Sequence, residues 1–263
     1  MAVLVVFAGG RSVRFGRDKC TYVHGGRRLV DYVVEAASPV VDEVYIAAGQ
    51  NAGLYRGEKV LADSPRFSGP LAAVDAAVAL FDDVLLFAPC DAPFLRTEAF
   101  RRLLEWGEPF VAWVYPNGRV ESTIFKTSPA EARRVLDFLA RHRRSRIDDL
   151  FRTGPTRLLS MAKHGVDPAW FLNINRPEDF EKRVEVSSVV FSDDVRLEWP
   201  VPPLYRWLEE GDAGALEAEF LRYVELGLFS LAAHVAKDLA AVYKNFGLVG
   251  ELLYDLVDIE KAR

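Results

Sequence analysis

Short apolar runs alternate with stretches of helical periodicity through the first two thirds of this 263-residue chain, and this alternation constrains the fold more than any other feature. Parallel strands that are buried on both faces read as continuous apolar runs, and a crossover helix usually joins each pair. The sequence therefore predicts an α/β fold with a mostly parallel sheet and helices on both faces. We expect strands at residues 2–8, 43–48, 59–62, 84–88, 110–115, 122–126 and 156–160, and helices at residues 28–37, 69–80, 97–105, 129–141, 147–151 and 177–184.

The pattern changes after about residue 185. Residues 187–197 alternate weakly and are a strand candidate, and a proline-rich segment then precedes helices expected at residues 215–226, 229–246 and 248–259. We therefore expect an α/β domain at residues 1–186 and a mostly helical C-terminal extension at residues 187–263, to which the sequence assigns no role.

Composition excludes several classes of protein. The formal net charge of −5 argues against a nucleic-acid-binding surface that dominates the molecule but does not exclude a local basic site. The apolar run at residues 2–6 is too short for a signal-peptide core or a membrane span. The two cysteines, Cys20 and Cys90, lack Cys-x-x-Cys spacing, so the sequence indicates neither a disulfide framework nor a thiolate metal site, and a reducing cytoplasm is the expected location. The basic run at residues 141–146 is expected to be a solvated helix end.

A glycine pair follows the first expected strand. Gly9 and Gly10 lie where that strand ends, and Arg14 and Lys19 bring positive charge to the same loop. Because glycine has no Cβ, a phosphate can approach the backbone closely, so the loop suits a nucleoside triphosphate. The spacing differs from that of a Walker A loop, and a tight strand-to-helix turn explains the pair equally well when it is taken alone.

Other polar side chains also follow expected strands or precede helices. Asp91 stands between two prolines after residues 84–88, where its carboxylate could bind Mg²⁺ together with substrate phosphates or could cap the next helix. Asp63 follows another strand, and open α/β sheets bind ligands at the edge where such strands end, so we expect these groups to meet in one crevice. Asn173 and Asn175 share one side of an extended segment, where paired amides can orient a ligand or simply form a turn.

Taken together and in order, four segments of the chain resemble the molybdenum cofactor guanylyltransferase family. They are the glycine loop at residues 7–19, Gly-Pro-Leu at residues 69–71, Cys-Asp-x-Pro-Phe at residues 90–94 and Asn-x-Asn-x-Pro-Glu-Asp at residues 173–179. The resemblance covers about residues 1–184 and implies a Rossmann-like nucleotidyltransferase domain. It further implies that the protein transfers GMP from GTP to molybdopterin, releases pyrophosphate and uses Mg²⁺.

The resemblance also implies roles for individual residues. The residues that it assigns to nucleotide binding are Phe7, Ala8, Gly9, Gly10 and Asp63. Those that it assigns to catalysis are Arg14 and Lys19, which face the triphosphate, and Asp91, the Mg²⁺ ligand. It places Asn173 and Asn175 on the pterin side of the site.

One position departs from the family pattern. Members often carry an Asn directly after the second strand, where it touches the nucleotide, whereas this chain has Ala-Ala-Gly-Gln-Asn at residues 47–51. That contact is therefore either shifted to Asn51 or missing, which bears on the choice of base.

Two alternatives stay open. A related nucleotidyltransferase would use CTP, or would act on a sugar-phosphate or phospho-acid acceptor. A non-catalytic GTP-binding adaptor would instead dock a molybdoenzyme or chaperone partner through its C-terminal helices. Packing between those helices is the simpler explanation for the apolar residues at helical spacing, which are Phe220, Tyr223, Val224, Leu231, Val235 and Leu239.

Overall fold

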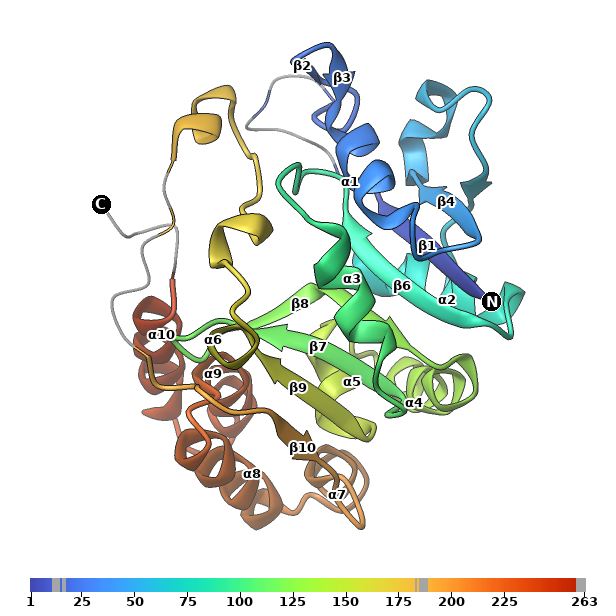
Figure 1. Cartoon of the computed structure of the whole chain (residues 1–263). Helices are drawn as coiled ribbons and strands as arrows, with labels where there is room; N and C mark the ends of the chain where they lie inside the picture. Colours follow the sequence, from blue (N-terminus) through green and yellow to red (C-terminus); the bar gives the residue numbers. More distant parts are fainter. Residues whose placement is uncertain (11–14, 16–17, 183, 185–188, 259–263) are drawn as a thin grey trace.

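The computed structural model describes residues 1–10, 15, 18–182, 184 and 189–258. Its centre is an eight-stranded sheet with the order β10-β9-β7-β8-β6-β1-β4-β5 (Figure 1). The strands of this sheet are β1 (Ala2–Phe7), β4 (Glu43–Ala47), β5 (Val60–Leu61), β6 (Val84–Pro89), β7 (Phe110–Val114), β8 (Val120–Thr127), β9 (Thr156–Ser160) and β10 (Val195–Leu197). A separate hairpin consists of β2 (Val23–His24) and β3 (Arg27–Arg28).

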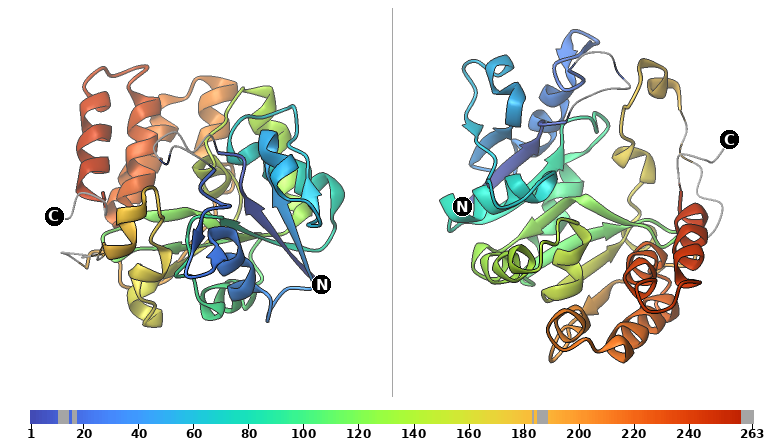
Figure 2. Two further views of the ribbon diagram at one scale, coloured as in Figure 1. Left: turned by 90° about the horizontal axis from the view of Figure 1, so that it is seen from above. Right: turned by 180° about the vertical axis from the view of Figure 1, so that it is seen from behind.

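Helices cover both faces of the sheet (Figures 1 and 2). The helices within the first two thirds are α1 (Leu29–Ala37), α2 (Pro70–Leu80), α3 (Thr97–Leu104), α4 (Pro129–Arg141), α5 (Asp148–Thr153) and α6 (Met161–His164), with 3₁₀ turns η2 (Gly49–Leu54), η3 (Pro168–Phe171) and η4 (Pro177–Glu181). The C-terminal helices are α7 (Pro203–Glu210), α8 (Ala213–Glu225), α9 (Phe229–Leu239) and α10 (Phe246–Leu256). The predicted fold class, an α/β sheet with a helical C-terminal extension, is confirmed.

Alternation along the strands builds two hydrophobic cores. In β1, Val3 and Val5 join the core on the side of α2, α4 and α5, whereas Leu4 and Val6 join the core on the side of α1 and α3. All four side chains are fully buried. Because successive side chains of a strand point to opposite faces, a short apolar run supplies both cores at once.

The sheet is less uniformly parallel than the rhythm of the sequence suggests. β8 lies between β6 and β7 and runs antiparallel to both, and β10 runs antiparallel to β9. The physical reason at β8 is the short turn at residues 115–119, which can join antiparallel neighbours but cannot cross over to a parallel one. This reversal brings the first residues of β8 to the edge where β6 and β7 end.

The C-terminal helices pack against one another and against the sheet. Leu231, Val235 and Leu239 are fully buried in the same core as the strands, which confirms that their spacing reflects packing. The prediction of a single helix at residues 229–246 is wrong. α9 ends at Leu239, and α10 folds back along it. The Phe246 ring at the start of α10 packs on Phe220 of α8 at 5.3 Å between centroids. The expected boundary between residues 186 and 187 lies outside the described residues.

A buried ionic network attaches this extension to the α/β domain. The fully buried Arg152 guanidinium, on α5, donates to both carboxylate oxygens of Glu219 on α8 at 2.8 Å and to Asp238 on α9 at 2.7 Å. Arg144 donates to Asp238 and to Asp149 as well, both at 2.8 Å. Burial by itself would raise the pKa of Asp238, but the two arginines outweigh it and lower that pKa to about 2.

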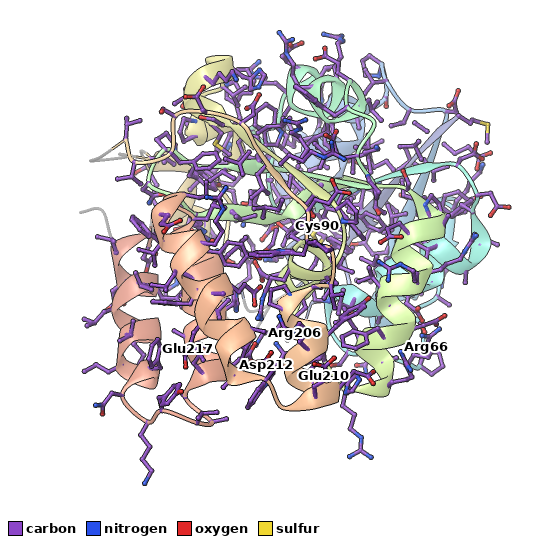
Figure 3. All side chains as sticks on the ribbon, turned by 90° about the horizontal axis from the view of Figure 1, so that it is seen from below. Arg66, Cys90, Arg206, Glu210, Asp212 and Glu217 are labelled. Atoms are coloured by element: carbon purple, nitrogen blue, oxygen red, sulfur yellow. A yellow bond between two sulfur atoms is a disulfide. The ribbon has the colours of Figure 1, made fainter. Side chains whose placement is uncertain are left out.

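This network corrects the expectation that residues 141–146 are a solvated helix end. α4 does end at Arg141, but the Arg144 side chain turns inward to the buried carboxylates. Its partner Asp238 lies 94 residues further along the chain, so no local pattern indicated this contact. Solvated charges lie instead on the outer surface of the extension, where Figure 3 shows Arg206 beside Asp212, its ion-pair partner. None of the described helices combines the length and apolarity needed to cross a bilayer.

We expect Arg152→Met to lower the free energy of unfolding by about 3–5 kcal/mol, because it leaves the buried Glu219 carboxylate without its counter-charge. Urea denaturation measures this change. The control is Arg101→Met, which removes an exposed pair with Glu98 and should change the free energy by less than about 1 kcal/mol. Equal losses in the two variants would contradict a structural role for the network.

Candidate active site

The carboxyl ends of β1, β4 and β6 open into a cavity of about 480 Å³, which we call the first cavity. The register explains why they meet: Phe7 at the end of β1 pairs with Ala47 of β4 and with Pro89 of β6. Loops that leave these strands therefore start side by side. The lining of the first cavity includes Phe7, Gly9, Gly10, Lys19, Asp63, Asp91, Asn173 and Asn175 from the residues predicted to form the site, together with Cys20, Cys90, Gly69, Pro70 and Thr123.

The glycine turn forms one wall of the first cavity. The Phe7 ring stacks on Phe87 at 5.4 Å between centroids and anchors the end of β1. Ala8 donates its backbone N–H to the Ala47 carbonyl at 2.8 Å and is buried in the core, so its side chain does not reach the cavity. Apart from Gly10 itself and its chain neighbours, no described atom lies within 4 Å of the position that a Cβ would take on Gly10, and Gly10 lines the first cavity, where a ligand could approach the backbone.

Lys19 and Asp91 meet inside the first cavity although 72 residues separate them. The Lys19 Nζ forms an ion pair with Asp91 Oδ2, and the same ammonium group lies 3.4 Å from Asn175 Oδ1. The Asp91 side chain is only 6 % exposed, so a cation beside it offsets the cost of its burial. The structure therefore brings together one carboxylate, one ammonium group and one amide in the cavity that the glycine turn lines.

The segment that carries the two asparagines is fastened to the Asp91 loop. Ile174 donates its backbone N–H to the Asp91 carbonyl at 2.7 Å, and buried Asp179 accepts from the backbone N–H of Asn175 at 2.7 Å. The acidic end of the Asn-x-Asn-x-Pro-Glu-Asp segment thus holds the turn that presents the amides. The buried Oδ1 atom of Asn173 has no hydrogen-bond partner among the described residues.

Asp63 and the start of α2 form another wall of the first cavity. Gly69 and Pro70, at the first turn of α2, line the first cavity, so the positive end of this 11-residue helix faces the same space. The surrounding protein partly desolvates Asp63 and raises the pKa of its carboxyl. This wall therefore offers both a helix terminus suited to phosphate and an acidic side chain suited to a hydrogen-bond donor.

Arg14 and Asn51 are not among the described residues that line the first cavity. Arg14 lies outside the described residues. Asn51, the candidate for the displaced family contact, donates to Asp18 at 2.8 Å and lies 3.4 Å from the Gly10 carbonyl, so it stands beside the glycine turn and does not line the first cavity.

The structure corrects the interpretation of the cysteines. Cys20 and Cys90 form a disulfide across 70 residues, with their Cα atoms 5.3 Å apart. Local spacing rules gave no sign of this pair, because only the adjacency of the β1 and β6 loops brings the two residues together. Disulfides are rare in cytosolic proteins apart from those of hyperthermophiles, so the cysteines no longer favour a reducing compartment. The bond joins the neighbour of Lys19 to the neighbour of Asp91.

Sequence reasoning also missed Thr123, which lines the first cavity from β8. Its backbone N–H and its hydroxyl both donate to buried Glu121, at 3.0 and 2.5 Å. A threonine inside a strand carries no motif, so no signal in the sequence could have identified it. Its position depends on the reversal of β8.

The oxygen donors of the first cavity suit a hard divalent cation. Mg²⁺ usually takes one or two protein carboxylates and completes its shell with substrate phosphates and water. Asp91 supplies a carboxylate, and the amide residues Asn173 and Asn175 also line this cavity. Within the part of the chain that the structure describes, no group of three or more His, Cys, Asp or Glu side chains could hold a metal ion, so such a cation would depend on ligands from the substrate.

Comparison with known sequences agrees with this geometry. The sequence model of the MobA-like NTP transferase domain matches residues 4–155. A molybdenum cofactor guanylyltransferase of Sinorhizobium fredii is 31% identical over 204 residues, which covers 69% of this chain and 89% of the relative. The corresponding enzyme of Cereibacter sphaeroides is 32% identical over 191 residues and covers 68% and 93%.

Solved structures show the same fold. Molybdopterin-guanine dinucleotide biosynthesis protein A of Archaeoglobus fulgidus superposes with a TM-score of 0.55 at 22% identity, over 69% of this chain and 95% of that one. A 4-diphosphocytidyl-2C-methyl-D-erythritol synthase of Anaerococcus prevotii gives a TM-score of 0.53 at 13% identity, with 69% and 95% covered. At these identities the likeness concerns the fold alone.

We expect the double variant Cys20→Ser, Cys90→Ser to lower the free energy of unfolding by up to about 4 kcal/mol, since the disulfide closes a loop of 70 residues in the unfolded chain. Urea denaturation with and without a thiol reductant measures this. The reductant should destabilise the wild-type protein by a similar amount and leave the variant unchanged. An effect of the reductant on the variant, or none on the wild type, would contradict the assignment.

Proposed function

The chain belongs to the MobA-like NTP transferase family, and from this premise we propose that it is a molybdenum cofactor guanylyltransferase, which transfers GMP from GTP to molybdopterin and releases pyrophosphate. The names of its relatives at 31% and 32% identity support this substrate pair. The observation that carries the proposal is the meeting of Lys19, Asp91 and the glycine turn in the first cavity.

The proposed reaction is an in-line displacement at the α-phosphorus of GTP. An oxygen of the molybdopterin phosphate forms a new bond to that phosphorus, while the bond to the bridging oxygen breaks and its electron pair leaves with pyrophosphate. A phosphate monoester is already largely ionised at neutral pH, so the attacking oxygen needs no protein base. The protein contributes mainly by aligning the groups and stabilising charge.

The residues of the first cavity would have different roles in this reaction. The backbone at Gly9 and Gly10 and the first turn of α2 would bind the nucleotide phosphates. Lys19 would neutralise the charge that grows on the leaving pyrophosphate. Lys19 pairs with Asp91, so phosphate oxygens would compete for its ammonium group. The pair thus holds the lysine side chain within the site.

The proposal includes Mg²⁺, with Asp91 as its protein ligand and with Asn173 or Asn175 as neighbouring oxygen donors. When bound, the ion would supply positive charge to the phosphate oxygens. We also propose a cytoplasmic location, which the proposed use of GTP supports, although a disulfide such as Cys20–Cys90 is rare in that compartment.

Packing limits where a protein partner could dock. Leu231, Val235 and Leu239 lie inside the core, so they offer no surface. An exposed face that remains on the extension is that of α10, where Leu248 and Leu252 are 62 % and 60 % exposed. We propose this face of α10 as the apolar contact for a molybdoenzyme or chaperone partner.

Pyrophosphate release measured with GTP, CTP or ATP, each with and without molybdopterin, tests the proposed function. We expect release only when GTP and molybdopterin are both present with Mg²⁺. A preference for CTP would favour the related cytidylyl transfer, and release with a sugar phosphate alone would change the acceptor. Tight GTP binding without any release would favour the adaptor.

We expect Asp91→Asn to lower kcat by about 10² or more, because it removes the charge that would hold the cation while preserving the shape of the side chain. Lys19→Ala should weaken GTP binding or turnover without unfolding the protein. The control is Asp82→Asn, whose side chain is 91% exposed and lies outside the first cavity. Near-normal turnover in Asp91→Asn would remove this residue from the catalytic role.

A further inference from the structure

A second cavity, of about 410 Å³, opens beside the first. It lies between the start of β8 and the helices α9 and α10, and its lining includes Arg119, Asp148, His234 and Tyr254. Because β8 is reversed, its first residues stand at the edge of the sheet where β6 and β7 end. The two cavities therefore share the edge at which open α/β sheets bind ligands.

Two residues line both cavities. Thr123 projects from β8, and Asn173 comes from the segment that is fastened to the Asp91 loop. The Asn173 side chain also carries a buried Oδ1 atom that has no hydrogen-bond partner among the described residues. Burying an amide oxygen without a hydrogen bond is unfavourable, so this atom is suited to accept a bond from a ligand that passes from one cavity to the other.

The C-terminal extension is held rigidly against the second cavity. At the turn between β7 and β8, Gly118 adopts a φ of +85°, and any Cβ there would collide with the carbonyl oxygen of Gly227, which precedes α9. Ser230 of α9 accepts the Val120 N–H at 2.9 Å. Asn117 donates to the carbonyl of Val257, just after α10, at 3.2 Å. These contacts fix α9 and α10 to the strand that forms the opposite wall.

The wall formed by the extension carries polar groups in fixed positions. The imidazole of His234 lies 3.1 Å from the Asp148 carboxylate and also contacts the Tyr254 hydroxyl. Burial by itself would raise the pKa of Asp148, but His234 holds that pKa below its usual value. Burial raises the pKa of Tyr254, so its hydroxyl keeps its proton and remains a donor. Carboxylate, imidazole and phenol thus face one cavity.

We propose that the second cavity binds the heterocyclic end of the acceptor, and that His234 and Tyr254 of the C-terminal extension contact it directly. This inference rests on the proposed function. The acceptor phosphate must reach the nucleotide in the first cavity, and the rest of the molecule then extends through the junction at Asn173. A pterin has an amino group, a ring N–H and a ring carbonyl, which match the acceptors and donors of this wall.

The assignment gives the extension a role in substrate binding. Helices α9 and α10 lie outside residues 4–155, the part that the family's sequence model matches. The acceptor subsite would therefore be completed by a segment of this chain that the family domain does not include.

Binding of neopterin monophosphate, a fluorescent pterin with a phosphorylated side chain, tests the proposal without turnover. The full-length protein is first saturated with Mg²⁺ and a GTP analogue whose α,β-bridging oxygen is a methylene, so that the first cavity is filled and no bond can break. Wild type, His234→Gln, Tyr254→Phe and the control Leu252→Ala are then titrated with the pterin. Affinity for the GTP analogue and the melting temperature are measured for each variant.

We expect His234→Gln and Tyr254→Phe to weaken pterin binding by about tenfold each, which is the effect of losing one hydrogen bond in a desolvated site. Affinity for the GTP analogue should stay within about twofold, and Leu252→Ala, at an exposed position of α10, should bind as wild type does. Unchanged pterin binding in both variants would overturn the proposal, as would an equal loss of affinity for the GTP analogue. If His234→Gln does not fold, Tyr254→Phe decides alone.

Failure of the proposed function gives a different result. In that case the wild-type protein itself does not bind the pterin. The acceptor is then not a pterin, and both the proposed function and the proposed pterin subsite are wrong. If wild type binds and the two variants bind equally well, the proposed function stands and only the role of the extension is overturned.

Discussion

The parallel pairing of β1 with both β4 and β6 is the constraint on which the rest of this structure depends. Because Phe7 is in register with Ala47 and Pro89, the chain leaves three neighbouring strands at one point of the sheet edge. The glycine turn, Lys19 and Asp91 then lie within reach of one another without any local sequence signal that links them. The same adjacency allows the Cys20–Cys90 disulfide, which joins the two loops that carry the charged pair.

A second constraint is the buried network around Arg152. Removing water from five charged groups costs free energy, so such networks often stabilise the folded state no more than apolar side chains of similar volume would. Their geometric demands are strict, however, because every donor must meet its acceptor. In this protein the network requires α8 and α9 to dock on α5 in one arrangement. That arrangement places His234 opposite β8 and so creates the second cavity.

The sequence predicted most elements of the α/β domain, because burial on both faces leaves apolar runs that periodicity can detect. It also predicted the family and several of the residues that line the first cavity, but it missed Thr123, and it included Ala8, which is buried in the core, and Arg14, which lies outside the described residues. Where it was wrong, the cause was contact between residues distant in sequence. Arg144 looked solvated because its partner Asp238 lies on a helix 94 residues further along. The cysteines looked unpaired for the same reason, and the direction of β8 was not predicted because an apolar pattern does not record strand direction.

By itself, the sequence determined the fold class, most of the strands and helices in their order along the chain, and the types of side chain available at the carboxyl edge of the sheet. These properties follow from local patterns: burial dictates periodicity, and glycine and proline dictate where elements end. Only the tertiary structure decided which of those side chains share a cavity, which charges are buried, and that the C-terminal helices border the site. The physical reason is that ion pairs, disulfides and cavities depend on distances in space, and the packing of the sheet and helices sets those distances.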